Sequence, residues 1–576
     1  MSMDRIAAAH VLEQIASYLE LKGENPFRVR AFRGAAKAVL SVPRDLSAAL
    51  ADGSLAATKG VGPATLGIIR ELNETGKATM LEELREEVPP GLIEMLGVSG
   101  LGVTRIRTIH EKLGVETLSE LEDAARKGTL AGLPGFGPRT ADAVLKGIAR
   151  LRRGQAFRLS HHAADEAAIL REALGRLPGV NRAIVAGEVR RRTEVVREVV
   201  VVLVTEGTPA ELFRALGEMA GVDEVTGSDE RQVTLRFASG TAARVIATTP
   251  ANFGAVLVQA TGSESHLEAL AAHATARGFA LNAAGLWRGR AFVPTPDEAV
   301  FYAALGLDEI PPELREGGDE IAQAEARTLP RLIDLSDLHG FLHCHTSYSD
   351  GNVTVEEMAG ACREAGYAYV GITDHSKAAA YAGGLTEADV VRQWAEIDEV
   401  NAKRIGIRVL KGIESDILAD GSLDYDDEIL AGFDFVIASV HSRFQMDEAA
   451  MTARVLRALD NPYLTILGHP TGRLLLSRDP YPLDLEQVFA RAGDRGVAIE
   501  INADPHRLDL DWRLLRRARA AGAMISIGAD AHNRAGLGYM PYGVAMARKG
   551  GLTSGEVLNA RTAAEFLQFA GARRRR

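Results

Sequence analysis

The sequence has few cysteines, few aromatic residues and no long apolar run. Cys344 and Cys362 are the only cysteines among 576 residues, which excludes a disulfide framework and is typical of a reducing compartment. No apolar run approaches the roughly 20 residues of a membrane-spanning helix, and the first residues lack the apolar segment of a signal peptide. We therefore expect a cytoplasmic protein without membrane contact.

The chain is too long for a single hydrophobic core. Its composition, 46% hydrophobic and 25% charged, is that of globular domains. At about 150 residues per domain, the length predicts roughly three to five units. The net charge is −11, but the first third of the chain has a small excess of lysine and arginine. Local positive patches, and not the total charge, decide whether a protein binds nucleic acid.

Three short glycine-centred turns recur in the first third of the chain. They read KGVGPATLGII (59–69), SGLGVTRIRTI (99–109) and PGFGPRTADAVL (134–145). In each, an apolar residue separates two glycines and a helical pattern follows, so unpaired N–H groups at the helix start suit a phosphate. The pattern predicts helix–hairpin–helix motifs that bind the DNA backbone, with plain packing units as the alternative. The predicted contacts are Gly60, Gly62, Gly100, Gly102, Gly135, Gly137, Arg105 and Arg139.

The order of three further segments resembles that of family X DNA polymerases. These segments are LELKGENPFRVRAFRGAAKAVLSV (19–42), LPGVNRAIVAGEVRRRTEVVREVVVVLV (177–204) and ANFGAVLVQATGSESH (251–266). The first is an amphipathic helical pattern interrupted at Asn25-Pro26. The resemblance implies a small helical DNA-binding domain (1–80), a fingers-like region with two hairpins (81–155), a nucleotidyltransferase-like palm (156–245) and a thumb (246–315).

The valine-rich run 193–204 has the pattern of a strand buried on both faces. In the family, this palm strand carries two aspartates and a neighbouring strand carries a third, because two magnesium ions about 3.5–4 Å apart need hard oxygen ligands. Here the corresponding positions are Glu198, Val200 and Arg244. One carboxylate, one aliphatic side chain and one cation cannot hold two divalent ions. We therefore predict a degenerate palm without polymerase activity.

Two other features of the palm bear on this prediction. The family's glycine–serine pair, which cradles the nucleotide triphosphate, reads Gly187-Glu188 here, and a carboxylate repels phosphate. The neighbouring Arg190, Arg191 and Arg192 are basic residues available to a DNA backbone. The palm half is therefore predicted to act as a DNA clamp.

After a polar linker (316–338), seven strand-like runs alternate with helical segments such as 354–366 and 485–496. Alternation of this kind predicts a parallel sheet with right-handed crossovers, and seven units indicate a distorted (β/α) barrel with its site at the carboxyl ends of the strands. The runs are FLHCHTSYSDG (341–351), YVGITDHS (369–376), VLKGIESD (409–416), FVIASVHS (435–442), LTILGHP (464–470), VAIEINA (497–503) and MISIGADAH (524–532).

Most of these runs end on a residue that can bind a metal. The candidates are His343, His345, Asp350, His375, Glu414, His441, His469, Asp530 and His532. Cys344 is interpreted as a buried thiol, and His339 and His506 as ordinary histidines. The nine candidates match the ligands of the polymerase and histidinol phosphatase (PHP) family, so residues 339–572 resemble a PHP domain. The fold class is accordingly multidomain, α+β and α/β.

The PHP resemblance implies three divalent ions per chain. His343, His345, Glu414 and Asp530 would surround one ion, and Glu414 would bridge to a second ion held by His441 and His469. Asp350, His375 and His532 would hold the third. Nitrogen and oxygen ligands suit manganese or zinc, with iron as a further option.

The chemistry that follows is phosphate-ester hydrolysis by metal-activated water, with His343, His345, Glu414 and Asp530 at its centre. Arg473 is a candidate phosphate clamp, with a structural ion pair as the alternative. Asp374 and Asp416 are predicted to orient the ligands.

A family X polymerase body joined to a PHP domain resembles bacterial two-module DNA repair proteins. This resemblance implies a monomeric 3′→5′ exonuclease, with related 3′-phosphatase or abasic-site endonuclease activity, on gapped, nicked or 3′-recessed DNA. The alternatives are a small-molecule phosphatase of the histidinol phosphatase type, a non-catalytic DNA-end scaffold and an active gap-filling polymerase.

Overall fold

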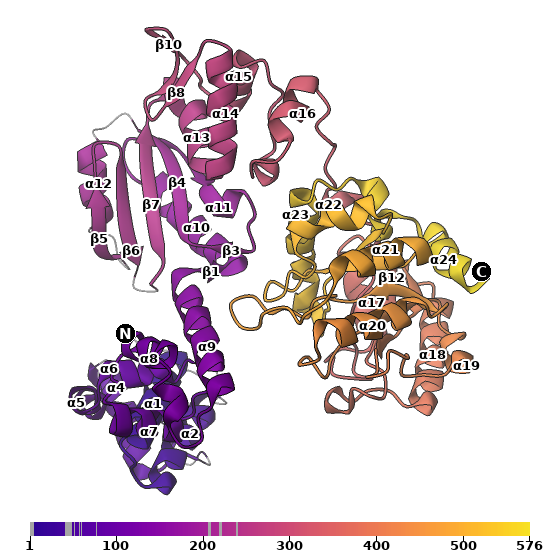
Figure 1. The fold of residues 1–576 in the computed structure, drawn as a ribbon, viewed down its shortest axis with the longest axis horizontal. Coiled ribbons are helices and arrows are strands. Elements are labelled where there is room, and N and C mark those ends of the chain that lie inside the picture. Colours follow the sequence, from indigo (N-terminus) through magenta and orange to yellow (C-terminus); the bar gives the residue numbers. More distant parts are fainter. Residues whose placement is uncertain are drawn as a thin grey trace. The chain divides into compact units, whose positions relative to one another are not determined.

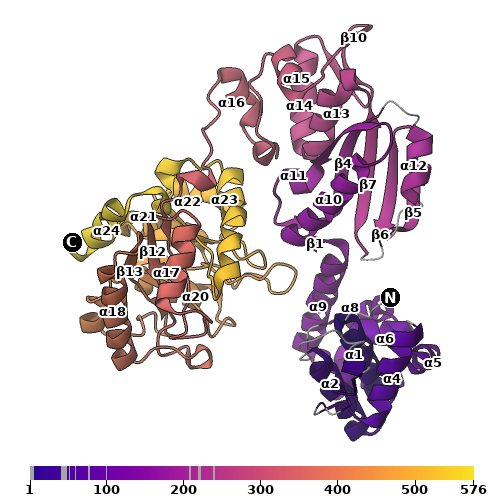
Figure 2. The ribbon, with the colours of Figure 1, turned by 180° about the vertical axis from the view of Figure 1, so that it is seen from behind.

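A computed structural model describes residues 5–40, 49–50, 52–56, 58, 60–75, 78–98, 100–205, 209–217, 222–237 and 240–575. Contacts divide the chain into two units, Met1–Ala156 and Phe157–Arg576, which are described separately (Figures 1 and 2). Within the described residues, no helix has the length and apolar character needed to cross a membrane.

The first unit is helical and has one hydrophobic core, to which Leu12, Phe32, Ile69 and Ile106 contribute. The sequence pattern predicts a break at Asn25-Pro26, and α1 indeed ends before it while α2 begins at Pro26, where a missing N–H costs nothing. The helices are α1 (Arg5–Leu21), α2 (Pro26–Leu40), α4 (Pro63–Thr75), α5 (Thr79–Glu87), α6 (Pro90–Met95), α7 (Val103–Leu113), α8 (Leu118–Arg126) and α9 (Pro138–Ala156).

The three glycine-centred turns have the same backbone form. Gly60, Gly100 and Gly135 have φ values of 104°, 88° and 81°, in the left-handed region that L side chains rarely adopt. The second glycine of each turn directly precedes α4, α7 or α9, so the first N–H groups of these helices follow the turn. The turns therefore have the backbone geometry of the predicted hairpins. Lys59 and Ser99, which open two of the quoted segments, lie outside the described residues.

The region predicted as the palm contains a five-stranded sheet in the order β2-β4-β7-β6-β5. The second strand in this order, β4, contains most of the valine-rich run, and every residue between its two ends is buried. Val199, Val201 and Leu203 face the core beneath α10, whereas Val200, Val202 and Val204 pack with α13. Side chains alternate between the two faces of a strand, and both faces are covered here, which explains the run of valines. The prediction of a strand buried on both faces is confirmed for residues 199–204, whereas Val195 and Val196 form a separate two-residue strand.

Helices and strands are interspersed along the chain in the palm (Figure 1). They are β1 (Arg158–Leu159), α10 (Ser160–Gly175), β2 (Val180–Ala186), α11 (Gly187–Arg190), β3 (Val195–Val196), β4 (Glu198–Thr205), α12 (Pro209–Gly217), β5 (Val222–Ser228), β6 (Gln232–Phe237) and β7 (Ala242–Thr248).

A helical and hairpin region follows the palm. Its elements are α13 (Phe253–Thr261), α14 (Glu264–Ala276), β8 (Ala280–Asn282), β9 (Gly285–Arg288), β10 (Ala291–Val293), α15 (Glu298–Ala304) and α16 (Glu320–Ala326). The last of these lies in the stretch predicted as a linker. It is attached to α14 by a buried ion pair, in which His266 Nδ1 lies 2.7 Å from Glu320 Oε1. The beginning of the predicted linker is therefore helical and attached to α14.

The C-terminal strands form two parallel sheets, β11-β12-β13 and β14-β15-β16-β17-β18. The sequence instead predicts a single parallel sheet of seven strands. The run 409–416 makes two strands because the chain changes sheet at Gly412. A Cβ atom there would lie 2.6 Å from the Ile372 carbonyl oxygen. The strands are β11 (Gly340–Phe341), β12 (Tyr369–Ile372), β13 (Arg408–Lys411), β14 (Glu414–Asp416), β15 (Val436–Ser439), β16 (Leu464–Leu467), β17 (Ala498–Asn502) and β18 (Ile525–Gly528).

Isolated bridges join the two sheets beside the predicted ligands. Cys344 pairs with Ala531 and His375 pairs with Glu414, both in parallel. Strand residues alternate between an outer core under the helices and an inner core around Phe566 of α24. The helices are α17 (Val355–Glu364), α18 (Glu387–Ala402), α19 (Asp427–Leu430), α20 (Glu448–Leu459), α21 (Leu485–Arg495), α22 (Trp512–Ala520), α23 (Met540–Lys549) and α24 (Ala563–Ala572). The helices predicted at 354–366 and 485–496 are confirmed as α17 and α21.

Candidate metal centre

All nine predicted metal-type residues lie close to the carboxyl ends of parallel strands. His343 and His345 follow β11, His375 follows β12, and His441 follows β15. His469 follows β16, and Asp530 and His532 follow β18. Glu414 opens β14 directly after β13 ends, so the break at Gly412 brings it to the same rim. Carboxyl ends of parallel strands meet on one face, which explains why distant residues converge.

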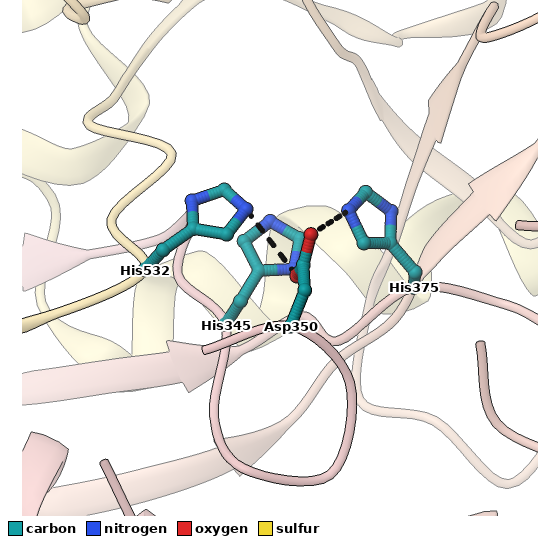
Figure 3. Close-up of side chains that lie close together, drawn as sticks. All are labelled: His345, Asp350, His375 and His532. Atoms are coloured by element: carbon teal, nitrogen blue, oxygen red, sulfur yellow. Dashed lines mark ion pairs between the residues drawn. The ribbon is translucent and has the colours of Figure 1, made fainter. Parts of the chain in front are cut away.

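One group of ligand atoms surrounds Asp350. Figure 3 shows its carboxylate between the rings of His375 and His532, with His345 alongside. The Asp350 oxygens lie 3.3 Å from His532 Nε2 and 3.6 Å from His375 Nε2. The side chains of Asp350 and His532 are 35% and 36% exposed, so this group opens to solvent.

A second group surrounds Glu414, whose side chain is fully buried. Its Oε1 atom lies 3.0 Å from His469 Nε2 and 3.3 Å from His441 Nε2. Its Oε2 atom lies 2.8 Å from His375 Nδ1. The single carboxylate is therefore shared by three histidines that come from different strands.

A third group joins His343, His345 and Asp530. Asp530 Oδ1 lies 3.0 Å from His345 Nε2 and 3.6 Å from His343 Nε2. Among the described residues, every group of three or more converging metal-type ligands belongs to this rim.

Several of these buried atoms have no hydrogen-bond partner. His343 Nε2, His345 Nδ1 and His469 Nδ1 are all buried without one. A buried polar atom without a partner is costly in an apolar interior and calls for an explanation. Nitrogen and carboxylate atoms that converge in this way suit divalent transition metals, so the residues fit metal ions.

The carboxylates change the protonation of the histidines. Burial alone would lower the histidine pKa values, but Glu414, with Asp350, outweighs it and raises the pKa of His375 to about 10. Glu414 and Asp416 likewise raise the pKa of His441 to about 9 despite burial. For His343, burial is outweighed by Glu500, Asp530 and Glu414, and its pKa is also raised. Without metal, His375 and His441 are therefore cations at neutral pH.

Metal binding is therefore expected to release protons. A histidine binds metal as the neutral ring, so the apparent manganese affinity should rise with pH until His441 and His375 lose their protons, at about pH 9 and about pH 10. The stability of the metal-free fold should depend on pH in the opposite direction. Because the folded-state pKa values are raised, the histidine charges stabilise this fold fully below about pH 6.5. This stabilisation is lost as the pH rises through the folded-state pKa values. Calorimetry in buffers of different ionisation enthalpy measures the proton release. A binding enthalpy that is independent of the buffer would contradict the prediction.

Further carboxylates hold the histidines in place. His441 Nδ1 lies 2.6 Å from Asp416 Oδ1, in agreement with the orienting role predicted for Asp416. Asp374 instead accepts hydrogen bonds from the backbone and side chain of Thr346 and from Gln393, and so fixes the loop that follows His345.

Glu500 is the supporting residue that the sequence analysis does not identify. It is 1% exposed within β17, lies 2.6 Å from His343 Nδ1 and accepts the backbone N–H of His469. Gly528 on the adjacent strand leaves room for it, since a Cβ atom there would lie 2.1 Å from Glu500 Oε1. The available signal is a carboxylate inside an apolar strand, which needs a buried partner.

Replacing Glu500 by glutamine is expected to weaken metal binding by about 10- to 100-fold, the usual effect of removing a supporting partner of a ligating histidine. The amide keeps the size of the carboxylate but loses its charge, so His343 is less basic. Metal titration of the full chain measures the change, with the exposed His339→Gln variant as control. An unchanged affinity would mean that Glu500 is only structural.

Backbone strain marks the same rim. His469 and Asp530 have φ values of 24° and 53°, although neither is glycine. Such conformations cost on the order of 1–3 kcal/mol each and persist where surrounding structure enforces them. The strained backbone at His469 and Asp530 thus lowers stability but directs two of the nine side chains toward this centre.

The structure corrects the prediction that Arg473 is a phosphate clamp. Its Nη1 atom donates to Asp511 Oδ2 at 2.7 Å, its Nε atom donates to the carbonyl oxygen of Arg507 at 3.1 Å, and its Nη2 atom donates to the carbonyl oxygen of Leu508. The side chain is 8% exposed. A clamp needs free donors, so the alternative of a structural ion pair is the one observed.

The palm positions Glu198, Val200 and Arg244 offer far fewer metal-type ligands than this centre. Arg244 and Glu198 form an ion pair, with 2.8 Å between Nη2 and Oε1, and each side chain is about one-third exposed (32% and 30%). Val200 is 2% exposed and lies opposite Arg244 in the parallel β4–β7 pairing. The three positions thus come together, as the alignment predicts, but they present one carboxylate that is already paired.

A cavity of about 840 Å³ adjoins these residues, and its lining includes Glu188, Arg197 and Ser263. Glu188 accepts the backbone N–H of Arg197 at 2.6 Å. Arg190 and Arg191, predicted to be available to DNA, form ion pairs with Glu298 and Glu316 at 2.5 and 3.0 Å. Both arginines therefore serve internal contacts, which corrects that expectation.

The two arginines predicted to contact DNA behave differently. Arg105 donates to the Gly100 carbonyl oxygen at 2.8 Å and so closes its own turn. Arg139 follows the third turn and is exposed. Arg105 is exposed as well, with its Nη1 atom engaged by its own turn.

The modules match known families. Residues 342–504 match the PHP domain family, and residues 256–316 match the DNA polymerase beta thumb. Residues 3–78 match a helix–hairpin–helix domain, and residues 92–150 match a SAM-like helix–hairpin–helix tandem. The fold and the site together define a DNA-binding protein that carries a metal-dependent hydrolase domain.

One relative matches the chain along almost its whole length. The chain is 37% identical over 570 residues to the DNA polymerase/3′-5′ exonuclease PolX of Bacillus subtilis, which covers 97% of this chain and 98% of that protein. The chain belongs to the family X DNA polymerases with helix–hairpin–helix domains, a thumb and a C-terminal PHP domain.

Shorter relatives match part of the chain. A probable phosphatase of Thermoanaerobacter sp. (strain X514) is 29% identical over 229 residues, 38% of this chain and 88% of that protein. A probable phosphatase of Acetivibrio thermocellus is 34% identical over 199 residues, 33% of this chain and 78% of that protein.

Proposed function

We propose that this chain is a metal-dependent 3′→5′ exodeoxyribonuclease that trims 3′ ends in gapped, nicked or 3′-recessed DNA. The observation that carries this proposal is the convergence of nine histidine and carboxylate side chains on one rim, several with buried nitrogen atoms that lack a partner. The name of the Bacillus subtilis relative includes a 3′-5′ exonuclease, which supports the same activity.

The nine residues fall into sets that would hold three divalent ions, manganese or zinc. The ligands around Asp530, around Glu414 and around Asp350 form the three sets. When bound, such ions supply an activated water and neutralise phosphate charge. The chain's own residues hold these ions, and Asp416 and Glu500 fix the orientation of the ligand rings. The partly exposed group around Asp350 leaves an open side through which a DNA end can approach.

The remaining modules would hold the DNA. The three hairpin turns place helix N-termini behind glycines, where a phosphate can approach the backbone closely. In the palm, the Arg244–Glu198 ion pair and the buried Val200 are incompatible with two divalent ions, so this half is proposed to act as a clamp without nucleotide addition.

A primer assay tests the proposal. A 5′-labelled primer on a gapped template, incubated with the full chain, manganese and all four nucleotides, should only become shorter. Lengthening would contradict the assignment of the palm, and an unchanged primer would support a DNA-end scaffold instead.

Removal of a 3′-phosphate is a second candidate activity. It is favoured by the shorter relatives, which are described as probable phosphatases. A primer ending in a 3′-phosphate distinguishes the two activities, since loss of the phosphate precedes any shortening if both occur. Hydrolysis of histidinol phosphate at a comparable rate would instead indicate a small-molecule phosphatase.

A further inference from the structure

The loop between β17 and α22 carries an arginine whose backbone is tightly held. Arg473 donates hydrogen bonds to the carbonyl oxygens of Arg507 and Leu508. Thr471 donates its backbone N–H and its hydroxyl to the buried carboxylate of Asp509. These four hydrogen bonds hold residues 507–509 and so fix the direction in which the Arg507 side chain leaves the loop.

The Arg507 guanidinium, in contrast, has no hydrogen bond to any residue that the structure describes. Its one ion pair within those residues is long, 3.9 Å from Nε to Asp530 Oδ2, and its side chain is 21% exposed. Two other arginines of this domain, Arg454 and Arg473, donate from all their nitrogen atoms to protein acceptors. Arg507 therefore combines a fixed backbone with free donors beside a predicted metal ligand.

The charges around Arg507 indicate what it would bind. Burial is outweighed by Asp530, Asp509 and Glu414, so the pKa of Arg507 is raised and its guanidinium stays charged. A permanent cation beside a site for several divalent cations is repelled by them unless an anion lies between. A planar guanidinium matches two oxygens of a phosphate, which fits this position better than a second carboxylate would.

We infer that Arg507 binds the substrate phosphate at the metal centre by donating hydrogen bonds to its non-bridging oxygens. Arg473, which lies between β16 and β17, is then a positioning residue that acts through the Arg507 backbone. This inference rests on the proposed phosphoester hydrolysis, and it assigns the phosphate-binding role to a different arginine from the one that the sequence pattern predicts.

The test measures phosphate binding directly. Inorganic phosphate is titrated into the manganese-loaded full chain by calorimetry, for the wild type and for Arg507→Gln and Arg507→Lys, and bound manganese is measured in each. The matched control is Arg408→Gln, because Arg408 is an exposed arginine at the amino end of β13, in the same domain. The primer assay then gives kcat and KM for each variant.

Arg507→Gln should weaken phosphate binding by about 10- to 100-fold, the range expected for a lost charge-assisted hydrogen bond. Its manganese content should stay unchanged, its KM should rise and its kcat should fall. Arg507→Lys should recover part of the affinity, and Arg408→Gln should match the wild type. Equal phosphate affinity in Arg507→Gln would overturn the inference. A loss of manganese would also overturn it, since Arg507 would then only hold Asp530.

The outcome is separable from that of the proposed function. If the wild type does not shorten DNA but binds phosphate through Arg507, the exonuclease proposal fails and the phosphate site stands. If the wild type shortens DNA and Arg507→Gln matches it in phosphate affinity and kinetics, the phosphate site alone fails.

Discussion

Replacing His343 and His345 together by alanine is expected to lower the rate of DNA shortening by more than about 100-fold, because loss of two direct ligands should exceed the loss of a supporting partner. Both side chains are completely buried and face the same carboxylates. DNA affinity should not change, since neither residue belongs to the hairpin turns. Gel shortening assays and fluorescence anisotropy with a labelled gapped duplex measure the two quantities.

The matched control for this variant is His339→Ala. His339 immediately precedes β11, whereas His343 and His345 follow it, and its side chain is exposed. It should keep wild-type activity and metal content. If the double variant still shortened DNA, the nuclease would have to lie elsewhere in the chain. If it lost DNA affinity as well, the PHP domain would take part in holding the DNA.

The metal-type residues could be predicted because each is encoded locally. A histidine or carboxylate placed just after an apolar run lies at a strand's carboxyl end, and parallel topology brings such ends together. Glu414 shows the limit of this reasoning. It lies at the rim because the run 409–416 divides into β13 and β14 around Gly412, where a Cβ atom would lie 2.6 Å from the Ile372 carbonyl oxygen of a neighbouring strand.

The residues that the pattern missed depend on contacts between loops. Arg473 and Arg507 both follow a strand, and the sequence gives no reason to prefer one as a phosphate ligand. The difference is that Arg473 meets Asp511 and two carbonyl oxygens, whereas Arg507 meets only a distant carboxylate oxygen. The sequence pattern does not predict the role of Glu500 for a related reason. Its partners His343 and His469 follow two other strands.

The three palm positions 198, 200 and 244 make contacts within the fold itself. Valine at position 200 extends the apolar row that packs against α13, and Gly187 lies close enough that a Cβ there would come within 2.9 Å of a Val200 methyl group. The charge at position 244 is neutralised by Glu198. The substituted positions are thus satisfied within the fold, and no metal is needed to stabilise them.

Restoring carboxylates at these positions is expected to restore nucleotide addition. In the His343→Ala/His345→Ala background, which prevents shortening, the changes Glu198→Asp, Val200→Asp and Arg244→Asp place three carboxylates together. Positions 198 and 200 share one face of β4, and Val200 pairs directly with Arg244 across β4 and β7. About two additional manganese ions should bind per chain, as a two-metal site requires, and a primer on a gapped template should lengthen.

The same background with Glu198→Asn, Val200→Asn and Arg244→Asn is the matched control, because the amides have the size of the carboxylates but bind divalent ions poorly. Only the carboxylate variant should gain metal and extend the primer. Equal extension by both would show that the ligands lie elsewhere, and extension by the background itself would mean that the palm is active as it stands. Extra metal without extension would place the remaining defect at Glu188, whose carboxylate occupies the position that cradles the nucleotide triphosphate in the family.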